Sequence, residues 1–174
     1  MPHYFAIYDW SLYTLPSSLP TSDIEYDTHA NDPASATYVP AENTWIGPSA
    51  TFTYNGGAPT LIAINDDDGI FEDLYVETGT NQTLAQNVTI NGTPFLAGSI
   101  IENEFSLVDS SGQEIWVVRI DGINVGFAYS IGEEPSPSDT FTAVTGRDGD
   151  PIDSGDGITA NEPYALIACF TPGV

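Results

Sequence analysis

The chain has 174 residues, the length of one ordinary domain or at most two small ones. It carries 25 acidic residues against two arginines and no lysine, so its formal net charge is −23. This charge argues against nucleic-acid binding through a basic surface and against docking on anionic lipid, because both need Lys and Arg. The 41% hydrophobic content is enough for a core, and 16 Gly and 13 Pro residues favour many turns.

The first predicted strand is His3–Trp10, in which successive apolar and aromatic side chains would point to opposite faces of a sheet. One face would hold Tyr4, Ala6 and Tyr8, and the other Phe5, Ile7 and Asp9. The next segment, Thr14–Trp45, is rich in Ser, Pro, Asp and Asn. This composition predicts a long irregular stretch over the surface.

Two strands predicted at Ala50–Tyr54 and Thr60–Ile64 flank the turn cluster Asn55–Pro59. This arrangement predicts a hairpin. Shorter candidate strands follow at Leu74–Glu77, Gln86–Ile90 and Thr93–Leu96. Asn91-Gly92, between the last two, has the residues that a tight turn with positive φ angles requires.

The clearest pattern is a run of three strands at Ile100–Val108, Glu114–Ile120 and Ile123–Tyr129. The connectors Asp109–Gly112 and Asp121-Gly122 carry the residues preferred in hairpin turns. The sequence therefore predicts an antiparallel meander. Alternation in its middle strand assigns Trp116, Val118 and Ile120 to one face, and Ile115, Val117 and Arg119 to the other.

Later strands are expected at Thr140–Thr145 and Tyr164–Phe170, and no segment keeps apolar residues at helical spacing for three turns. About ten short strands separated by turns predict an all-β fold, an antiparallel, jelly-roll-like β-sandwich with almost no helix. Seven aromatic residues are expected in the core or between the sheets: Tyr4, Trp10, Trp45, Phe52, Phe105, Trp116 and Phe127.

Two acidic clusters are candidate calcium sites. The first contains Asp66, Asp67, Asp68 and Asp73, and the second contains Asp148, Asp150, Asp153 and Asp156. Ca²⁺ takes six to eight oxygen ligands, which Asp-rich loops bent by Gly supply, and a bound dication relieves the repulsion between carboxylates. Neither cluster has the spacing of an EF-hand loop. Solvated turns are the alternative interpretation, because turns also prefer Asp and Gly.

Candidate catalytic residues are scarce. Glu102 and Glu104 lie two apart on a predicted strand and so share a face, which would suit a carboxylate-pair glycoside hydrolase. In a chain with 25 acids such pairs arise by chance, and we prefer the interpretation that both face solvent or a cation. Arg119 and Arg147 are expected to be structural partners of carboxylates. We therefore expect a protein that is not an enzyme.

The composition also bears on the compartment. Cys169 is the only cysteine, so no disulfide forms within the chain, and no apolar run approaches the length of a transmembrane helix. Met1–Phe5 lacks the basic and apolar regions of a signal peptide. An acidic, lysine-free surface suits salty or calcium-rich surroundings, and selection for solubility is the alternative. We expect an extracellular or surface-displayed protein, exported without an N-terminal signal peptide.

The end of the sequence resembles the start of the Hint (Hedgehog/intein) autoprocessing domain, a strand that enters Cys169 followed by the residues 170–173, Phe-Thr-Pro-Gly. Upstream, Glu114–Val118 and Gly146–Pro151 resemble the β-domain that precedes Hint in acidic secreted proteins of alphaproteobacteria. The resemblance implies a β-sandwich domain over residues 1–168 and the start of a truncated Hint-like segment over residues 169–174.

In that family the cysteine attacks the preceding carbonyl in an N-to-S acyl shift, and the thioester is then open to a nucleophile. The resemblance implies this role for Cys169 at the Ala168–Cys169 bond only in a longer chain, because the rest of Hint is absent. Val174 stands where the family usually has Thr. In the absence of that context, Cys169 is expected to be a buried strand residue.

Three functions follow as expectations. The first is a non-catalytic extracellular surface or structural module for adhesion, glycan binding or subunit assembly. The second is the passenger part of a Hint autoprocessing precursor, cleaved or ligated at Ala168-Cys169, and the third and least favoured is the glycoside hydrolase. Expected partners are a glycan or surface ligand and a second copy of the chain, through edge strands. The terminal segments His3–Trp10 and Tyr164–Phe170 would pair with their own sheet, which we prefer, or with a neighbour's edge.

Overall fold

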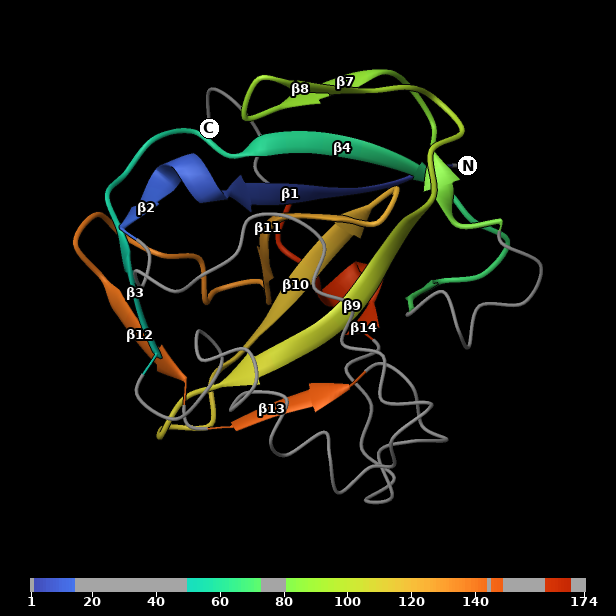
Figure 1. The fold of residues 1–174 in the computed structure, drawn as a ribbon. Coiled ribbons are helices and arrows are strands. Elements are labelled where there is room, and N and C mark those ends of the chain that lie inside the picture. Colours follow the sequence, from blue (N-terminus) through green and yellow to red (C-terminus); the bar gives the residue numbers. More distant parts are fainter. Residues whose placement is uncertain (1, 15–49, 73–80, 144, 149–161, 170–174) are drawn as a thin grey trace.

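A computed structural model describes residues 2–14, 50–72, 81–143, 145–148 and 162–169 (Figure 1). The strands are β1 (His3–Asp9), β2 (Tyr13–Thr14), β3 (Ala50–Tyr54), β4 (Thr60–Asn65), β5 (Ile70–Phe71), β6 (Thr83–Leu84), β7 (Val88–Ile90), β8 (Thr93–Phe95), β9 (Ile101–Val108), β10 (Glu114–Ile120), β11 (Ile123–Tyr129), β12 (Thr140–Ala143), β13 (Thr145–Asp148) and β14 (Glu162–Pro163). The helical elements of the described part are two 3₁₀ turns, η1 (Trp10–Leu12) and η3 (Tyr164–Leu166). The predicted all-β, antiparallel β-sandwich with almost no helix is confirmed.

A seven-stranded sheet in the order β13-β9-β10-β11-β1-β4-β6 forms the centre of the molecule (Figure 1). A three-stranded sheet in the order β12-β3-β2 lies against one of its faces, and the short pairs β14-β5 and β7-β8 complete the strands. The paired strands are antiparallel throughout. No helix in the described ranges is long and apolar enough to span a bilayer.

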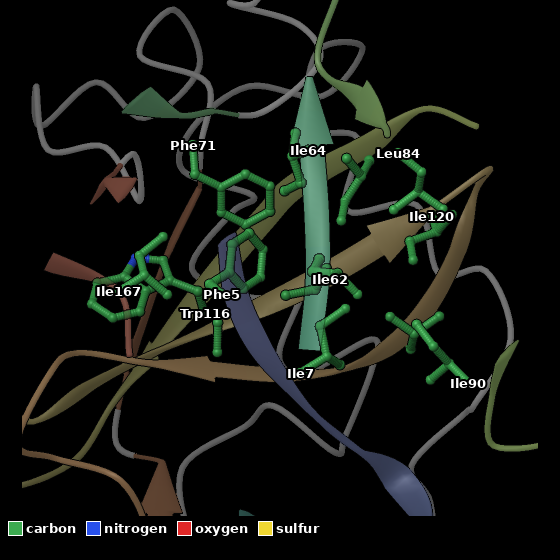
Figure 2. Close-up of a cluster of buried hydrophobic side chains, with 14 of the residues drawn as sticks. Phe5, Ile7, Ile62, Ile64, Phe71, Leu84, Ile90, Trp116, Ile120 and Ile167 are labelled. Carbon is green, nitrogen blue, oxygen red and sulfur yellow. The ribbon is translucent and has the colours of Figure 1, made fainter. Parts of the chain in front are cut away.

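The central sheet is buried on both faces, because apolar residues occupy alternate positions on both sides of its strands. The first core lies between the central sheet and the three-stranded sheet, and contains Ala6, Tyr8, Trp10, Tyr13, Phe52, Tyr54, Leu107, Ile115, Val117, Phe127, Tyr129, Phe141, Ala143 and Ala168. The second core, on the other face, contains Phe5, Ile7, Ile62, Ile64, Phe71, Leu84, Ile90, Phe95, Ile101, Trp116, Val118, Ile120, Val125, Ala128, Tyr164 and Ile167 (Figure 2). The faces predicted for the apolar residues of β1 and β10 agree with this division.

The predicted meander is confirmed, since β9 pairs with β10 and β10 with β11. Both expected Gly turns also form. Asn91 and Gly92 have φ angles of 48° and 79°, and Asp121 and Gly122 have 47° and 78°. Positive φ at both central residues is the geometry of a type I′ hairpin turn, which matches the twist of the flanking strands.

The predicted hairpin of Ala50–Tyr54 and Thr60–Ile64 is wrong. Both segments are strands, but β3 pairs with β2 and β12, whereas β4 pairs with β1 and β6. The two strands separate because their buried side chains belong to different cores. Phe52 belongs to the first core and Ile62 to the second, so the turn cluster between them carries the chain from one layer to another.

The segment Thr140–Thr145 also divides between two sheets, because β12 pairs with β3 and β13 pairs with β9. The predicted strands Gln86–Ile90 and Thr93–Leu96 are present in shorter form as β7 and β8. The strand predicted at Leu74–Glu77 lies outside the described residues, and so do residues 15–45 of the irregular stretch predicted at Thr14–Trp45. Its first residue, Thr14, is not irregular but ends strand β2.

The N-terminal strand lies inside the sheet, between β4 and β11. Its pairing with β11 covers only the partners Tyr8↔Phe127 and Asp9↔Gly126. Beyond this point the C-terminal segment occupies the space between them. Ala168 donates its N–H to the carbonyl of Tyr129 at 2.7 Å and accepts from the N–H of Ala6 at 3.0 Å. Both terminal segments therefore pair within their own chain.

The strand predicted at Tyr164–Phe170 is wrong, because the structure has the turn η3 there and then the single bridge Ser130↔Ile167. The turn places the Tyr164 ring on the His3 ring, with centroids 4.2 Å apart and planes nearly parallel. An extended strand would point alternate residues to opposite faces, whereas the turn keeps both Tyr164 and Ile167 in the second core.

The predicted core aromatics Trp10, Phe52, Trp116 and Phe127 are buried, as expected. The prediction that Tyr4 belongs to the core is wrong, since 47% of its surface is exposed. It begins the face of β1 that enters the first core only at Ala6. Trp45 and the side chain of Phe105 lie outside the described part of the structure.

Candidate functional site

A cavity of about 440 Å³ opens between the three-stranded sheet and the central sheet. We call it the tyrosine cavity, because its aromatic walls are Tyr13, Phe52, Tyr54, Tyr129 and Phe141. Its polar walls include Gln113, Glu133 and Asp139. The volume lies within the range of about 300–1,000 Å³ that small-molecule sites occupy. The aromatic side chains are each at most 8% exposed, so polar groups form most of the surface that a ligand would meet.

Neighbouring strands hold these aromatic residues in place. Tyr13 lies opposite Tyr54 in the pairing of β2 with β3, and Phe52 lies opposite Phe141 in the pairing of β3 with β12. Tyr129 ends β11 on the facing sheet. The cavity is therefore a seam between two sheets, and its walls are strand residues that their cross-strand partners orient.

The rings around the cavity contact one another edge to face. Tyr13 lies 5.3 Å from Phe127 and 5.6 Å from Tyr54, measured between ring centroids. Tyr8 lies behind them, 5.0 Å from Tyr129 and 5.8 Å from Tyr54. Such tilted and perpendicular contacts are the preferred geometry of aromatic pairs, so they stabilise this arrangement of the walls.

The hydroxyl groups of the cavity tyrosines already form hydrogen bonds within the protein. Tyr13 and Tyr129 share one hydrogen bond between their hydroxyl oxygens at 2.5 Å, and Tyr54 donates to the carbonyl of Gly57 at 2.5 Å. A shared bond uses one of the two phenolic protons, so the Tyr13–Tyr129 pair keeps one donor for a further acceptor.

Burial keeps these phenols protonated. It raises the pKa of Tyr8 to about 12, with smaller contributions from Tyr54 and Glu134. Burial, and next the neighbouring Tyr129, raises the pKa of Tyr13 far above its ordinary value of 10. Burial also raises the pKa values of Tyr54 and Tyr129. At neutral pH the cavity therefore presents hydroxyl donors and no phenolate.

Two carboxylates stand at the cavity. Asp139 has one oxygen fixed by the N–H of Ser136 at 2.8 Å, while its other oxygen accepts no hydrogen bond within the described residues. Its charge contributes to the raised pKa of Tyr129. The side chain of Glu133 accepts no hydrogen bond from the described part either, and Gln113 donates to the Glu133 backbone carbonyl at 3.3 Å.

The first acidic cluster follows β4, and hydrogen bonds from a distant tyrosine and from its own backbone hold two of its carboxylates. Asp66 accepts from the Tyr164 hydroxyl at 2.6 Å, and Asp68 accepts from the N–H of Ile70 at 2.8 Å. Asp67 and Asp68 are exposed. Within the described ranges no three His, Cys, Asp or Glu side chains form a group able to hold a metal ion.

The structure describes one of the five remaining predicted calcium ligands. Asp148 is the last residue of β13, and Asp73, Asp150, Asp153 and Asp156 lie outside the described residues. Of the predicted ligands, the described residues include Asp66, Asp67 and Asp68 of the first cluster and Asp148 of the second, and calcium binding by either loop stays a prediction.

Glu102 was expected to face solvent or a cation. The expectation that it faces solvent is wrong, because only 7% of Glu102 is exposed. It lies directly opposite Arg119 in the pairing of β9 with β10. Arg119 is itself buried and donates from Nε to the Asn124 side-chain oxygen at 3.2 Å. The side chain of Glu104 is outside the described part, so the pair Glu102–Glu104 stays untested as a hydrolase site.

Cys169 is exposed, which contradicts its expected burial as a strand residue. The residue before it, Ala168, is only 2% exposed and is hydrogen-bonded to strands on both sides. Burial ends between these two residues, because the 3₁₀ turn and the bridge at Ile167 bring Ala168, and not Cys169, into the gap between β1 and β11.

Sequence reasoning did not single out the tyrosine cavity. Its residues come from segments as distant as Tyr13 and Tyr129, and no local spacing connects them. One weak signal was available, since Tyr54 and Tyr129 each end a predicted strand, where a side chain reaches the rim of a sheet. Comparison of this chain with protein-family models, with curated proteins and with solved structures gave no match.

Proposed function

We propose that this protein is a non-catalytic, extracellular or surface-displayed module that binds a glycan in the tyrosine cavity. One observation carries the proposal, namely a cavity of about 440 Å³ whose lining combines five aromatic residues with the five polar residues Gln113, Glu133, Ser138, Asp139 and Thr140. The carboxylates, the Gln113 amide and a phenolic donor can bond the hydroxyl groups of a sugar, while the aromatic side chains, each at most 8% exposed, form the walls behind them.

The state of the tyrosines supports binding rather than catalysis. Phenols with raised pKa values stay neutral at physiological pH, so they act as hydrogen-bond donors and apolar walls and not as bases. The T-shaped packing of Tyr13 and Tyr129 against their neighbours keeps the walls in place before a ligand arrives. A preformed site loses less conformational entropy on binding.

The overall charge supports the proposed surroundings. A chain with 25 acids and two arginines repels itself at low ionic strength, and dissolved cations screen this repulsion. We place the protein outside the cell on this ground, where salt or calcium is abundant.

The experiment is a glycan-array screen of the labelled protein, followed by titration calorimetry with the glycans that bind. Gln113→Ala and Glu133→Ala should each weaken binding by about tenfold, the value of one lost hydrogen bond between the site and its ligand. Gln86→Ala is the matched control, because Gln86 is exposed and does not line the cavity. Absence of any bound glycan, or binding that the cavity variants leave unchanged, would contradict the proposal.

A second candidate is favoured by the geometry at Ala168. This residue is held on both sides by β1 and β11, while Cys169 is exposed, so a chain that ended at Ala168 would keep these contacts. Such an arrangement suits the passenger part of a Hint precursor that is released at the Ala168–Cys169 bond. Expression of the reading frame including any codons after Val174, with intact-mass analysis, should yield a product ending at Ala168. Its absence, or an equal yield from Cys169→Ala, would contradict this candidate.

A further inference from the structure

We infer that a second cavity, separate from the tyrosine cavity, binds a small neutral group that carries a carbonyl oxygen, of the size of an acetyl group. The inference goes beyond the proposed function, because it assigns a site at the other end of β11 from Tyr129. It depends on the buried amide of Asn124, which belongs to the lining of this cavity and whose nitrogen lacks an acceptor within the described residues.

The second cavity lies between the β7–β8 hairpin and the start of β11, and we call it the hairpin cavity. Its volume is about 130 Å³. The exposed lining residues are Asn91, Thr93 and Ile123, and the buried ones are Trp10, Ile90, Phe95, Asn124 and Val125. None of the described lining residues is charged, so the lining suits an uncharged ligand.

Two hydrogen bonds fix Asn124 in one orientation. Its side-chain oxygen accepts from Nε of Arg119 at 3.2 Å, and its backbone carbonyl accepts from the indole N–H of Trp10 at 2.7 Å. An arginine side chain has donors only, so the atom that faces it must be the amide oxygen, and the amide nitrogen takes the other side. Arg119 and Asn124 are only 5% and 1% exposed, so solvent does not compete for this contact.

The amide nitrogen of Asn124 is the unexplained atom. It is buried and has no acceptor within the described part of the chain. Leaving a buried donor unpaired costs free energy, so such a group in a folded protein calls for an acceptor. The guanidinium of Arg119 polarises the amide through its oxygen, which makes the nitrogen a better donor. A ligand oxygen in the hairpin cavity would supply the missing acceptor.

A β-bulge places Asn124 at this end of the strand. Val118 pairs with Gly126 and Arg119 with Asn124, so Val125 is an extra residue in β11. Bulges change the direction of side chains and are common next to binding sites. Here the bulge brings two consecutive residues, Asn124 and Val125, into the lining of one cavity.

The lining also indicates which kind of molecule fits. A bound water needs about two to four polar partners, whereas the buried lining residues other than Asn124 are hydrophobic, and the indole N–H of Trp10 is already bonded. The volume is below the roughly 300 Å³ of sites that enclose a whole small molecule. One carbonyl oxygen attached to a methyl-sized apolar part, as in an acetyl group, satisfies both the donor and the apolar walls.

A carboxylate fits this cavity less well than a neutral carbonyl. The chain has a net charge of −23, and the lining offers no cation among its described residues. Arg119 contacts Asn124 but lies opposite Glu102 in the pairing of β9 with β10, so its charge is already balanced.

The test is an NMR titration of the isotope-labelled protein with N-methylacetamide, N-acetylglucosamine, glucose and acetate. The side-chain amide signal of Asn124 is identified by its loss in Asn124→Asp. We expect both acetylated compounds to shift this signal and to bind about tenfold more tightly than glucose and acetate, because only they present a neutral carbonyl oxygen.

Asn124→Asp keeps the oxygen that faces Arg119 and removes the donor, so it should weaken binding of both acetylated compounds by about tenfold. Asn87→Asp is the matched control, because Asn87 lies outside the lining and its side-chain oxygen, which accepts from the N–H of Ala97, is retained.

A second pair of variants blocks the cavity without changing the amide. Thr93→Trp adds a large side chain at an exposed lining position and should weaken binding of both acetylated compounds by about tenfold or more. Thr89→Trp is its control, since Thr89 is exposed on the same hairpin and does not line the cavity. Circular dichroism melting of each variant checks that it is folded.

The outcomes are distinct. Tighter binding of N-acetylglucosamine than of N-methylacetamide would identify a sugar as the carrier of the acetyl group, and equal binding would support recognition of the acetyl group alone. An unshifted Asn124 signal with both acetylated compounds would overturn the inference and leave water as the occupant. Equal affinities in the native protein and Asn124→Asp, or acetate bound as tightly as N-methylacetamide, would also overturn it. The proposed function would still stand, because other residues line the tyrosine cavity.

Discussion

At the residue scale, the contact between β1 and β11 depends on one glycine. Gly126 lies opposite Asp9 in the register, and a Cβ atom at this position would lie 2.3 Å from the carbonyl oxygen of Tyr8 and 2.7 Å from the Cα of Asp9. Both are backbone atoms of a strand that β4 holds from the other side. The close approach therefore leaves no room for any side chain at position 126.

We predict that Gly126→Ala lowers the free energy of unfolding by about 3 kcal/mol, the upper part of the range for overpacking. Gly69→Ala is the control, because no atom lies within 4 Å of its added Cβ. Its effect should stay within about 0.5 kcal/mol. Urea denaturation of both variants measures the difference, and equal midpoints would show that β1 and β11 are further apart than described.

The buried tyrosines make the fold sensitive to alkali. A phenol whose pKa is raised in the folded state stabilises the fold below its unfolded pKa of about 10, and this contribution is lost as the pH rises through the folded value. Tyr8 has its folded pKa near 12, and burial raises that of Tyr13, Tyr54 and Tyr129 as well. Stability should therefore change little from these groups up to about pH 9 and fall above pH 10.

We predict that absorbance at about 295 nm, which reports tyrosinate, rises in two stages during titration. Tyrosines in contact with solvent ionise first, and the buried group of Tyr8, Tyr13, Tyr54 and Tyr129 ionises only as the protein unfolds. Circular dichroism recorded in parallel should change with the second stage. A single titration near pH 10 with an unchanged dichroism spectrum would contradict the burial of the four tyrosines.

At the element scale, the C-terminal segment closes a gap that the strands leave open. The N–H of Ile131 donates to the carbonyl of Leu166 at 2.9 Å, and Ala168 bonds to both β1 and β11. Ile167 enters the second core beside Phe5 and Trp116 (Figure 2). The C-terminal segment thus takes the place of a strand between β1 and β11. Backbone hydrogen bonds and the buried side chain of Ile167 hold it there.

We predict that Ile167→Ala lowers the free energy of unfolding by about 2–4 kcal/mol, the cost of a cavity at a buried aliphatic site. Ile167 is 1% exposed, whereas its neighbour Leu166 is 53% exposed. Leu166→Ala is therefore a matched control that should change stability by about 0.5 kcal/mol or less. Chemical denaturation gives both values, and a similar loss in the two variants would argue against the described 3₁₀ turn.

At the scale of the whole molecule, charge repulsion dominates the surface. The net charge is −23, and Arg119, one of the two arginines, is buried. Raising the ionic strength from about 0.01 M to about 1 M shortens the screening length from about 30 Å to about 3 Å. We predict a melting temperature higher by about 5 °C or more in the concentrated salt, which differential scanning calorimetry measures. A melting temperature independent of salt would show that the carboxylates do not destabilise the fold.

Calcium should add to this effect if the acidic loops bind it. We predict that millimolar CaCl₂ raises the melting temperature more than MgCl₂ at equal ionic strength, and that EDTA reverses the increase, because a ligand that binds only the folded state stabilises it. Asp67→Asn should reduce the difference between the two salts if the first cluster is involved, since Asp67 is exposed in that loop. Equal melting temperatures in the two salts would leave the loops as solvated turns.

The sequence by itself determined the elements that depend on short-range physics. Alternation in β1 and β10 predicted which residues enter each core, and Asn91-Gly92 and Asp121-Gly122 predicted two tight turns, because positive φ angles restrict the residue type locally. The short apolar runs separated by turns, with no segment at helical spacing, likewise predicted an all-β chain with little helix.

The tertiary structure decided which strands pair and what lies between them. β3 and β4 look like a hairpin in the sequence, but their side chains complete different cores, so they separate into two sheets. The turn at Tyr164 and the gap filled by Ala168 depend on β1 and β11, which are distant in sequence. The tyrosine cavity exists for the same reason. It forms only where β2, β3 and β12 meet β11, and burial by those strands, which no local pattern encodes, sets the pKa values of its phenols.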